Sequence, residues 1–175
     1  MGRLSRIQPA FCLGLSLAFI FCGAAASAAP GGGLVLADHV VVLKAQHRMF
    51  LYHGETLLAE YPIELGLNPV GRKEREDDFR TPEGHYMLER RNPHSDYFLS
   101  VEVSYPNKQD EKRAMKHHWA PGGEIMVHGL PNSPRYPLAY YVSKNWTNGC
   151  IALSDSNMVD FWMRTRDDIP IDIYP

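Results

Sequence analysis

The segments IMVHG (residues 125–129) and WTNGCIAL (residues 146–153) flank a proline-rich stretch near the C-terminal end of this 175-residue chain. His128 ends a short apolar run that predicts a buried strand. Cys150 follows Gly149, whose missing side chain lets the backbone approach a substrate closely. We therefore expect a thiol and an imidazole at the ends of two core strands, which is the layout that a cysteine acyltransferase needs.

The stretch between these segments, residues 131–137 (PNSPRYP), contains too many prolines for a helix or a central strand. We interpret it as a surface lid over the two reactive side chains. Taken alone, the two residues leave an alternative open, in which a buried cysteine and a strand-end histidine never meet.

The N-terminal end is typical of a secretory signal peptide. Arg3 and Arg6 precede an apolar run over residues 10–22, and an Ala-Ser-Ala pattern predicts cleavage after Ala28. The apolar run is shorter than the ~20 residues of a spanning helix, so we expect no stable membrane insertion after cleavage. The predicted organisation is a signal peptide at 1–28, a short linker at 29–37 and a catalytic domain at 38–175, located in the periplasm or cell wall.

Export changes what the cysteines indicate. The chain has three, and Cys12 and Cys22 would leave with the signal peptide. Phe21, directly before Cys22, disfavours a lipoprotein attachment site. The mature chain would keep Cys150 alone, and a lone thiol in an oxidising compartment points to a reactive residue or an intermolecular bridge.

Length and charge limit the class of protein. Cleavage after Ala28 leaves 147 residues, enough for one domain with a proper core. The formal charge of −2 becomes −4 without Arg3 and Arg6, and such an acidic balance argues against nucleic acid as a partner.

The pattern along the mature chain predicts a mainly β fold with two short helices. Strands are expected at residues 38–44, 49–52, 56–66, 86–90, 97–105, 125–128 and 169–174, the first three as an antiparallel meander. One helix is expected over residues 106–116, with Asn107 as its N-cap, and another after Ser154.

Two polar features have ordinary interpretations. The charged run over residues 72–78 predicts a solvated face. His117 and His118 could suggest a metal site with His128, but adjacent residues do not face each other on a helix and no acid or thiol stands at ligand spacing. No metal or other cofactor is expected.

The TNGCI sequence at 147–151 resembles the Ser/Thr-X-Gly-Cys-Ile/Val motif of L,D-transpeptidase catalytic domains of the YkuD type. The upstream His-Gly at 128–129 and the TPEG turn at 81–84 are similar to two further motifs of that family, and the resemblance extends over about residues 40–174. It implies a β-sandwich-like mixed sheet fold.

The resemblance also implies an exported enzyme that acts on peptidoglycan stem peptides through a thioester, forming cross-links or protein attachments in the cell wall. Cys150 would be the nucleophile and His128 the proton acceptor. The backbone N–H groups of Gly149 and Cys150 would form the oxyanion hole, and Thr147 or Asn148 would orient the imidazole.

One departure from the family pattern leaves the substrate contacts open. Many members have Arg two positions after the cysteine, where this chain has Ala152. Arg80, Arg135 and Lys144 are candidates to replace that charge, and Trp146 is a further candidate for substrate binding.

The CIALS version of the motif resembles a subgroup that includes an enzyme cleaving the bond between peptidoglycan and an attached lipoprotein. A hydrolase on the same scaffold, with a wall-attached lipoprotein as a further partner, is therefore the alternative function.

Other classes fit less well. A sortase-like enzyme needs an Arg partner downstream, but Arg164 and Arg166 fall on or beside the predicted helix. Papain-like wall peptidases place Cys before His in the chain, and an inactive wall-binding module has no use for a lone exported thiol.

Overall fold

The computed structural model describes residues 1–2 and 33–175, and residues 33–175 form one compact unit. The predicted signal peptide beyond residue 2, its cleavage site and residues 29–32 of the predicted linker lie outside the described residues. Among the described residues, no helix combines the length and apolar character needed to cross a bilayer.

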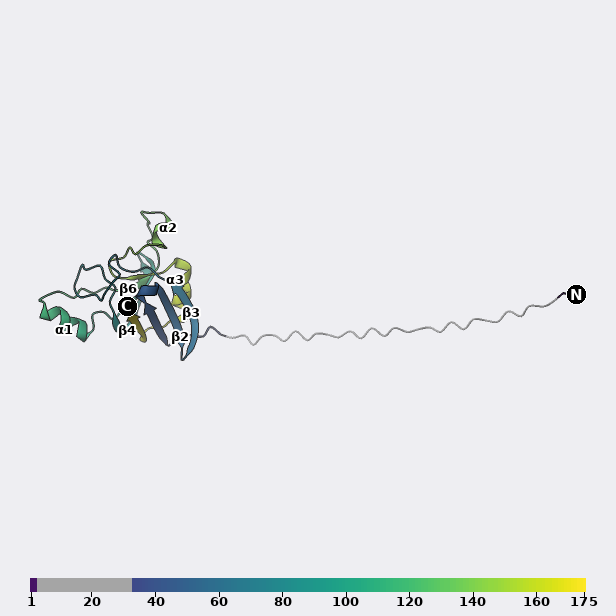
Figure 1. Ribbon diagram of the computed structural model, residues 1–175, viewed down its shortest axis with the longest axis horizontal. Helices are drawn as coiled ribbons and strands as arrows, with labels where there is room; N and C mark the ends of the chain where they lie inside the picture. The colour runs from purple at the N-terminus through teal and green to yellow at the C-terminus, as the bar shows by residue number, and fades with distance from the viewer. Residues whose placement is uncertain (3–32) are drawn as a thin grey trace. The chain divides into compact units, whose positions relative to one another are not determined.

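The unit is built on one mixed eight-stranded sheet with the order β3-β2-β1-β8-β4-β5-β6-β7. Figure 1 shows β2 and β3 side by side in this sheet. All neighbouring strands are antiparallel except the β1–β8 and β6–β7 pairs. The strands are β1 (His39–Leu43), β2 (Arg48–His53), β3 (Thr56–Pro62), β4 (Gly84–Ser95), β5 (Phe98–Val103), β6 (Met126–His128), β7 (Ile151–Ala152) and β8 (Ile169–Tyr174).

The first three strands form the predicted antiparallel meander, with the 3-10 turn Lys44–Gln46 between β1 and β2. Side chains alternate across it, so that Val40 and Val42 of β1 are fully buried. The C-terminal strand β8 lies between β1 and β4, and its alternate residues Ile169, Ile171 and Ile173 enter the same core. The mainly β class predicted from the sequence is confirmed.

The sheet curls so that its two edges meet. Beyond the end of β3, Glu64 exchanges backbone hydrogen bonds with Ala152 of β7, at 2.9 and 2.8 Å. Further on, the Leu67 N–H donates to the Thr147 carbonyl at 2.9 Å. The segment that follows β3 therefore lies directly beside the turn that carries Cys150.

Strand β4 extends to Ser95, whereas the sequence predicts an end at Arg90. Register shifts against β5 between Leu88 and Arg91 and again between Asn92 and Ser95 let the strand continue past Pro93, which has no N–H for a regular ladder. The longer β4–β5 hairpin places Asp96 and Tyr97 beside the site described below.

Both predicted helices are present. In α1 (Lys108–Lys116), the Asn107 side chain accepts hydrogen bonds from the N–H groups of Gln109 and Asp110, and Asp110 accepts one from the Asn107 N–H, which forms a capping box. In α3 (Asp155–Arg164), Ser154 is the N-cap, and Met158 and Phe161 are fully buried.

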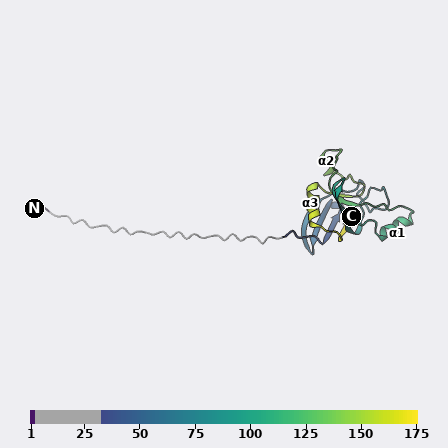
Figure 2. The ribbon, with the colours of Figure 1, turned by 180° about the vertical axis from the view of Figure 1, so that it is seen from behind.

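A third, one-turn helix, α2 (Leu138–Tyr141), corrects the predicted count of two. It follows the proline-rich stretch and stands away from the sheet in both views (Figures 1 and 2). Its single turn is too short to produce a helical pattern of apolar residues, so the sequence carries no signal for it.

Candidate active site

Strands β6 and β7 place His128 and Cys150 on one side of the sheet. Val127 lies opposite Ile151, and His128 lies opposite Ala152. One step back in this register, the Met126 position faces Cys150, and the Met126 N–H donates to the Cys150 Sγ at 3.4 Å. Because side chains alternate along a strand, those of 126 and 128 share a face, as do those of 150 and 152.

The His128 ring is buried and held by its own turn. Its Nδ1 lies 2.7 Å from the Gly129 carbonyl oxygen, and since a carbonyl only accepts, Nδ1 carries the proton. The Nε2 atom is then the free acceptor of a neutral imidazole. Burial disfavours the imidazolium and lowers the pKa of His128 to about 4, although the bond to Gly129 offsets part of this effect.

The Cys150 thiol has a polar surrounding made mainly of backbone. Besides accepting from the Met126 N–H, it donates to the Glu124 carbonyl at 3.6 Å. Burial raises the pKa of the thiol, while the Met126 N–H and the Lys73 ammonium act in the opposite direction. The resting pair is therefore a neutral thiol and a neutral imidazole.

Thr147 shapes the turn that presents the cysteine. Its buried hydroxyl donates to the Cys150 carbonyl at 2.8 Å and accepts from the Gly149 N–H at 3.1 Å. The Gly149 N–H, expected in the oxyanion hole, is thus engaged within the turn. Thr147 therefore holds the turn, whereas the imidazole is hydrogen-bonded to the Gly129 carbonyl and not to Thr147 or Asn148. Asn148 is exposed and lines the cleft.

Gly149 is required by both backbone conformation and space. Its φ of +132° lies in a region that L side chains rarely adopt, and a Cβ there would stand 2.7 Å from the Arg80 carbonyl oxygen. The loop before β4 therefore packs directly against the cysteine turn, and only glycine allows that approach.

Cys150 and His128 open into one cleft of about 900 Å³. Its walls come from the loop at residues 73–77, the β4–β5 hairpin, the segment before β6 and the cysteine turn. Four carboxylate side chains line it, from Glu76, Asp77, Asp96 and Glu124.

Among the described residues, Lys73 is the only lysine or arginine that lines this cleft. It belongs to the charged run expected to be solvated, and that expectation is wrong for this residue, which is only 4% exposed. Its ammonium donates to Asp78 Oδ1 at 2.9 Å and to the Arg75 carbonyl at 3.0 Å. Asp78 also accepts from three backbone N–H groups of the same loop.

The basic residues predicted to bind substrate lie elsewhere. The Arg80 side chain lies 3.6 Å from Glu74, and its residue contributes a backbone carbonyl to the site instead. Arg135 lines a neighbouring hollow, and Lys144 lines a different surface depression. Of the predicted substrate-binding set, Trp146 lines the cleft, with its ring centroid 5.5 Å from that of His128.

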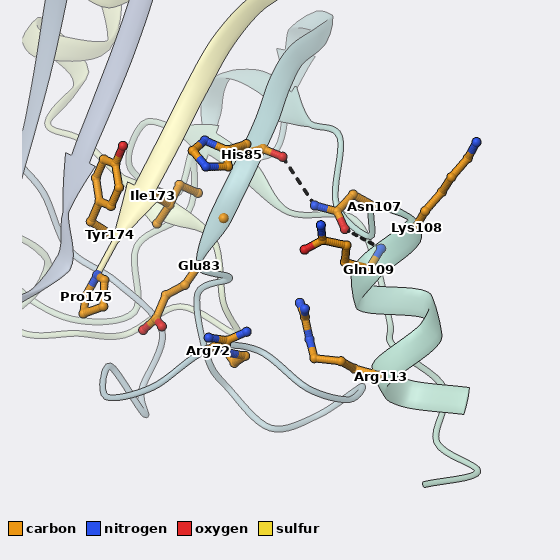
Figure 3. A pocket seen from close by; sticks show the side chains of 11 residues that line it. Arg72, Glu83, His85, Asn107, Lys108, Gln109, Arg113, Ile173, Tyr174 and Pro175 are labelled. Carbon is orange, nitrogen blue, oxygen red and sulfur yellow. Dashed lines mark hydrogen bonds between the residues drawn. The ribbon is translucent and has the colours of Figure 1, made fainter. Parts of the chain in front are cut away.

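A separate hollow of about 600 Å³ lies beside α1 and carries basic side chains from Arg72, Lys108 and Arg113 (Figure 3). There the Asn107 amide donates to the His85 carbonyl at 3.4 Å and ties α1 to β4. None of its lining residues, all within the described part of the chain, is a cysteine, serine or threonine, so it offers no thiol or aliphatic hydroxyl.

The three histidines considered for a metal site do not gather. His117 stacks on Trp119 after α1, with centroids 4.5 Å apart, while His128 is buried at the end of β6. Within residues 1–2 and 33–175, no three His, Cys, Asp or Glu side chains are placed to hold a metal ion together.

Comparison with known proteins identifies the family. Residues 37–173 match the YkuD family of L,D-transpeptidase catalytic domains, and the chain belongs to that family. The Escherichia coli K12 protein described as putative L,D-transpeptidase YafK is 31% identical over 97 residues, which cover 52% of this chain and 37% of that relative.

Solved structures share the fold. The helical cell shape determining protein Pgp2 from Campylobacter jejuni superposes with a TM-score of 0.58 at 26% identity, covering 78% of this chain and 47% of Pgp2. An L,D-transpeptidase from Mycobacterium smegmatis gives a TM-score of 0.54 at 16% identity, covering 79% of this chain and 59% of that protein. The chain thus spans about half or less of the length of Pgp2 and YafK.

Proposed function

We propose that this protein is an exported cysteine acyltransferase, an L,D-transpeptidase that acts on peptidoglycan stem peptides through a thioester on Cys150. The observation that carries the proposal is the cleft shared by Cys150 and a neutral His128 whose Nε2 is free to accept a proton. The family of the chain supports the reaction class.

The first half-reaction follows from these atoms. The Cys150 sulfur attacks the carbonyl of the third stem residue while His128 Nε2 accepts the thiol proton. The oxyanion accepts a hydrogen bond from the Cys150 N–H, a contact worth about 3 kcal/mol in comparable enzymes. Collapse breaks the peptide bond, the leaving D-Ala amine takes the proton from His128, and the thioester remains.

The second half-reaction transfers the acyl group to an acceptor. An amine attacks the thioester and gives a proton to His128. The C–S bond then breaks, and His128 returns the proton to the leaving sulfur, which restores the thiol and the neutral imidazole. The carboxylates of Glu76, Asp77, Asp96 and Glu124 attract an amine-bearing acceptor to the cleft, which favours cross-linking or protein attachment over hydrolysis. With water as the acceptor, the same site would trim stems or release a wall-attached lipoprotein, the alternative function.

Purified sacculi distinguish these outcomes. The mature protein and its Cys150→Ala variant are incubated with sacculi, and the stems are analysed by mass spectrometry. New amide cross-links with wild-type protein support the transferase, shortened stems or released protein support the hydrolase, and identical products from both proteins contradict the proposal.

A further inference from the structure

The neighbouring hollow that Arg135 lines has a volume of about 510 Å³. It opens beside the active-site cleft, between residues 131–137 (the lid) and the β4–β5 hairpin. Five aromatic residues line it: Tyr97, Tyr136, Tyr140, Tyr141 and Trp146. We call it the aromatic hollow. It shares Tyr97 and Trp146 with the cleft, so the two spaces are contiguous.

The walls of the aromatic hollow are held in place by hydrogen bonds. Asn132 of the lid accepts from the Phe98 N–H at 3.0 Å and donates to the Ser95 carbonyl at 2.8 Å, which fixes the lid to the hairpin. The Tyr141 hydroxyl accepts from the Arg135 N–H at 3.0 Å, and the Trp146 indole N–H donates to the Tyr141 carbonyl at 3.1 Å. The rings are thus arranged before any ligand arrives.

Two of these rings are exposed although they lie at a hollow. Tyr136 is 55% and Tyr97 42% exposed. Tyr136 lies against Tyr140 with centroids 4.5 Å apart, and Tyr97 lies against Trp146 at 6.0 Å in a stacked arrangement. Exposed aromatic faces on a prearranged wall are typical of a binding surface.

Polar groups accompany the rings. Asp96, Ser133 and Arg135 also line the hollow with exposed side chains, and they supply an acceptor, a hydroxyl and a charged donor. Aromatic faces with hydrogen-bonding groups at their edges match a pyranose ring, which presents C–H groups on its faces and hydroxyl or amide groups around its rim.

The aromatic hollow lies where the sugar of a bound stem peptide could reach it. In a stem peptide, three residues separate the attacked carbonyl from the sugar, which is about 10 Å of extended chain. The aromatic hollow begins at Tyr97, whose ring centroid is 4.7 Å from that of His128. A stem that reaches the cleft through this side would have its sugar at the aromatic rings.

We propose that the aromatic hollow binds an N-acetylated sugar ring of the glycan strand that bears the stem peptide. This inference rests on the proposed function and adds a glycan subsite to it. The sugar stacks on Tyr136 and hydrogen-bonds to the polar edge, and this contact directs its stem toward Cys150.

A kinetic comparison tests the subsite. The value of kcat/KM is measured for a disaccharide tetrapeptide and for the free tetrapeptide. Wild-type protein should prefer the sugar-bearing substrate by about tenfold, which corresponds to roughly 1.4 kcal/mol. The ratio should fall toward one in Tyr136→Ala and be kept in Tyr136→Phe and in Tyr174→Ala. Tyr174 is also exposed, at 43% against 55% for Tyr136, but lies outside the aromatic hollow. A wild-type ratio near one overturns the proposal.

A binding measurement separates this proposal from the proposed function. Tri-N-acetylchitotriose, which has no stem peptide, is titrated into Cys150→Ala protein and followed by NMR. Binding that the added Tyr136→Ala change abolishes and Tyr174→Ala retains supports the glycan subsite even if neither peptide is turned over. No binding of the sugar, or equal binding to the Tyr136→Ala protein, overturns the proposal. Displacement of the bound sugar by free tetrapeptide, which carries no sugar, also overturns it.

Discussion

At the scale of single residues, the site is a neutral pair. Burial lowers the pKa of His128 and raises that of Cys150, so both groups rest uncharged near neutral pH. In the proposed reaction the imidazole would therefore act as a general base during attack rather than hold a preformed thiolate.

The acid side of the pH profile tests this neutral state. His128 accepts a proton only when neutral, so kcat/KM should stay level as the pH falls toward 5 and decline with a midpoint near the His128 pKa of about 4. Circular dichroism at each pH confirms that the protein is folded. A midpoint near the ordinary histidine value of about 6.5 would contradict the assignment.

Lys73 provides a second test at this scale. Its ammonium favours the Cys150 thiolate, so Lys73→Met should raise the pKa of the thiol further and slow alkylation by iodoacetamide several-fold at pH 8. Lys144→Met, which removes an exposed charge outside the cleft, is the control. Equal alkylation rates in Lys73→Met and wild-type protein would show that this charge does not reach the thiol.

The sequence alone predicts Cys150 and His128 as candidates because each stands in a local pattern. Lys73 is missed because its burial depends on Asp78 and on the packing of a whole loop, and a charged run gives no sign of that. The Gly129 carbonyl is missed for another reason: every residue has one, so only geometry identifies it as the partner of the imidazole.

At the scale of elements, two short segments prepare the site. The turn over residues 147–150 is held by Thr147, and the lid is held by Asn132 against the β4–β5 hairpin. The sequence predicts the turn from its glycine. It also predicts residues 131–137 as a lid over the reactive side chains, but this segment lines the aromatic hollow and not the cleft. It does not predict the extended hairpin, because the register shifts that carry β4 past Pro93 depend on pairing with β5.

Removing one hydroxyl tests the role of the turn. Thr147→Val keeps the shape of the side chain but leaves the Gly149 N–H and the Cys150 carbonyl without their partner, which should lower the free energy of unfolding by about 1–3 kcal/mol. It should also slow acylation of Cys150. Thr165→Val, at an equally buried threonine bonded to Phe161, is the control.

The comparison of these two variants is decisive. Both should lower the melting temperature, but only Thr147→Val should slow acylation. Similar acylation rates in the two variants would mean that the Thr147 hydroxyl supports the fold without shaping the site.

At the scale of the whole molecule, the curled sheet brings together segments that lie far apart in the chain. The pairing of Glu64 with Ala152 joins the segment after β3 to β7, and β8 enters the middle of the sheet from the C-terminal end. Local patterns predict the strands, but these long-range pairings decide where the loop at residues 73–80 meets the cysteine turn.

The core beneath α3 carries much of this arrangement. Phe161 is fully buried among the sheet residues, so Phe161→Ala should lower the free energy of unfolding by about 3–5 kcal/mol in urea denaturation. Val159, on the same helix but 40% exposed, should cost far less when changed to Ala. Equal losses would mean that α3 is not anchored through the Phe161 face.

The central claim is that Cys150 carries the acyl group, and intact-mass spectrometry tests it most directly. The mature protein is mixed with a stem tetrapeptide, quenched in acid within seconds to minutes, and weighed. We expect a mass increase equal to the tripeptide acyl group, located on Cys150, absent in Cys150→Ala and removed by hydroxylamine as thioesters are. Turnover without such an adduct, or an adduct that persists in Cys150→Ala, would contradict the account.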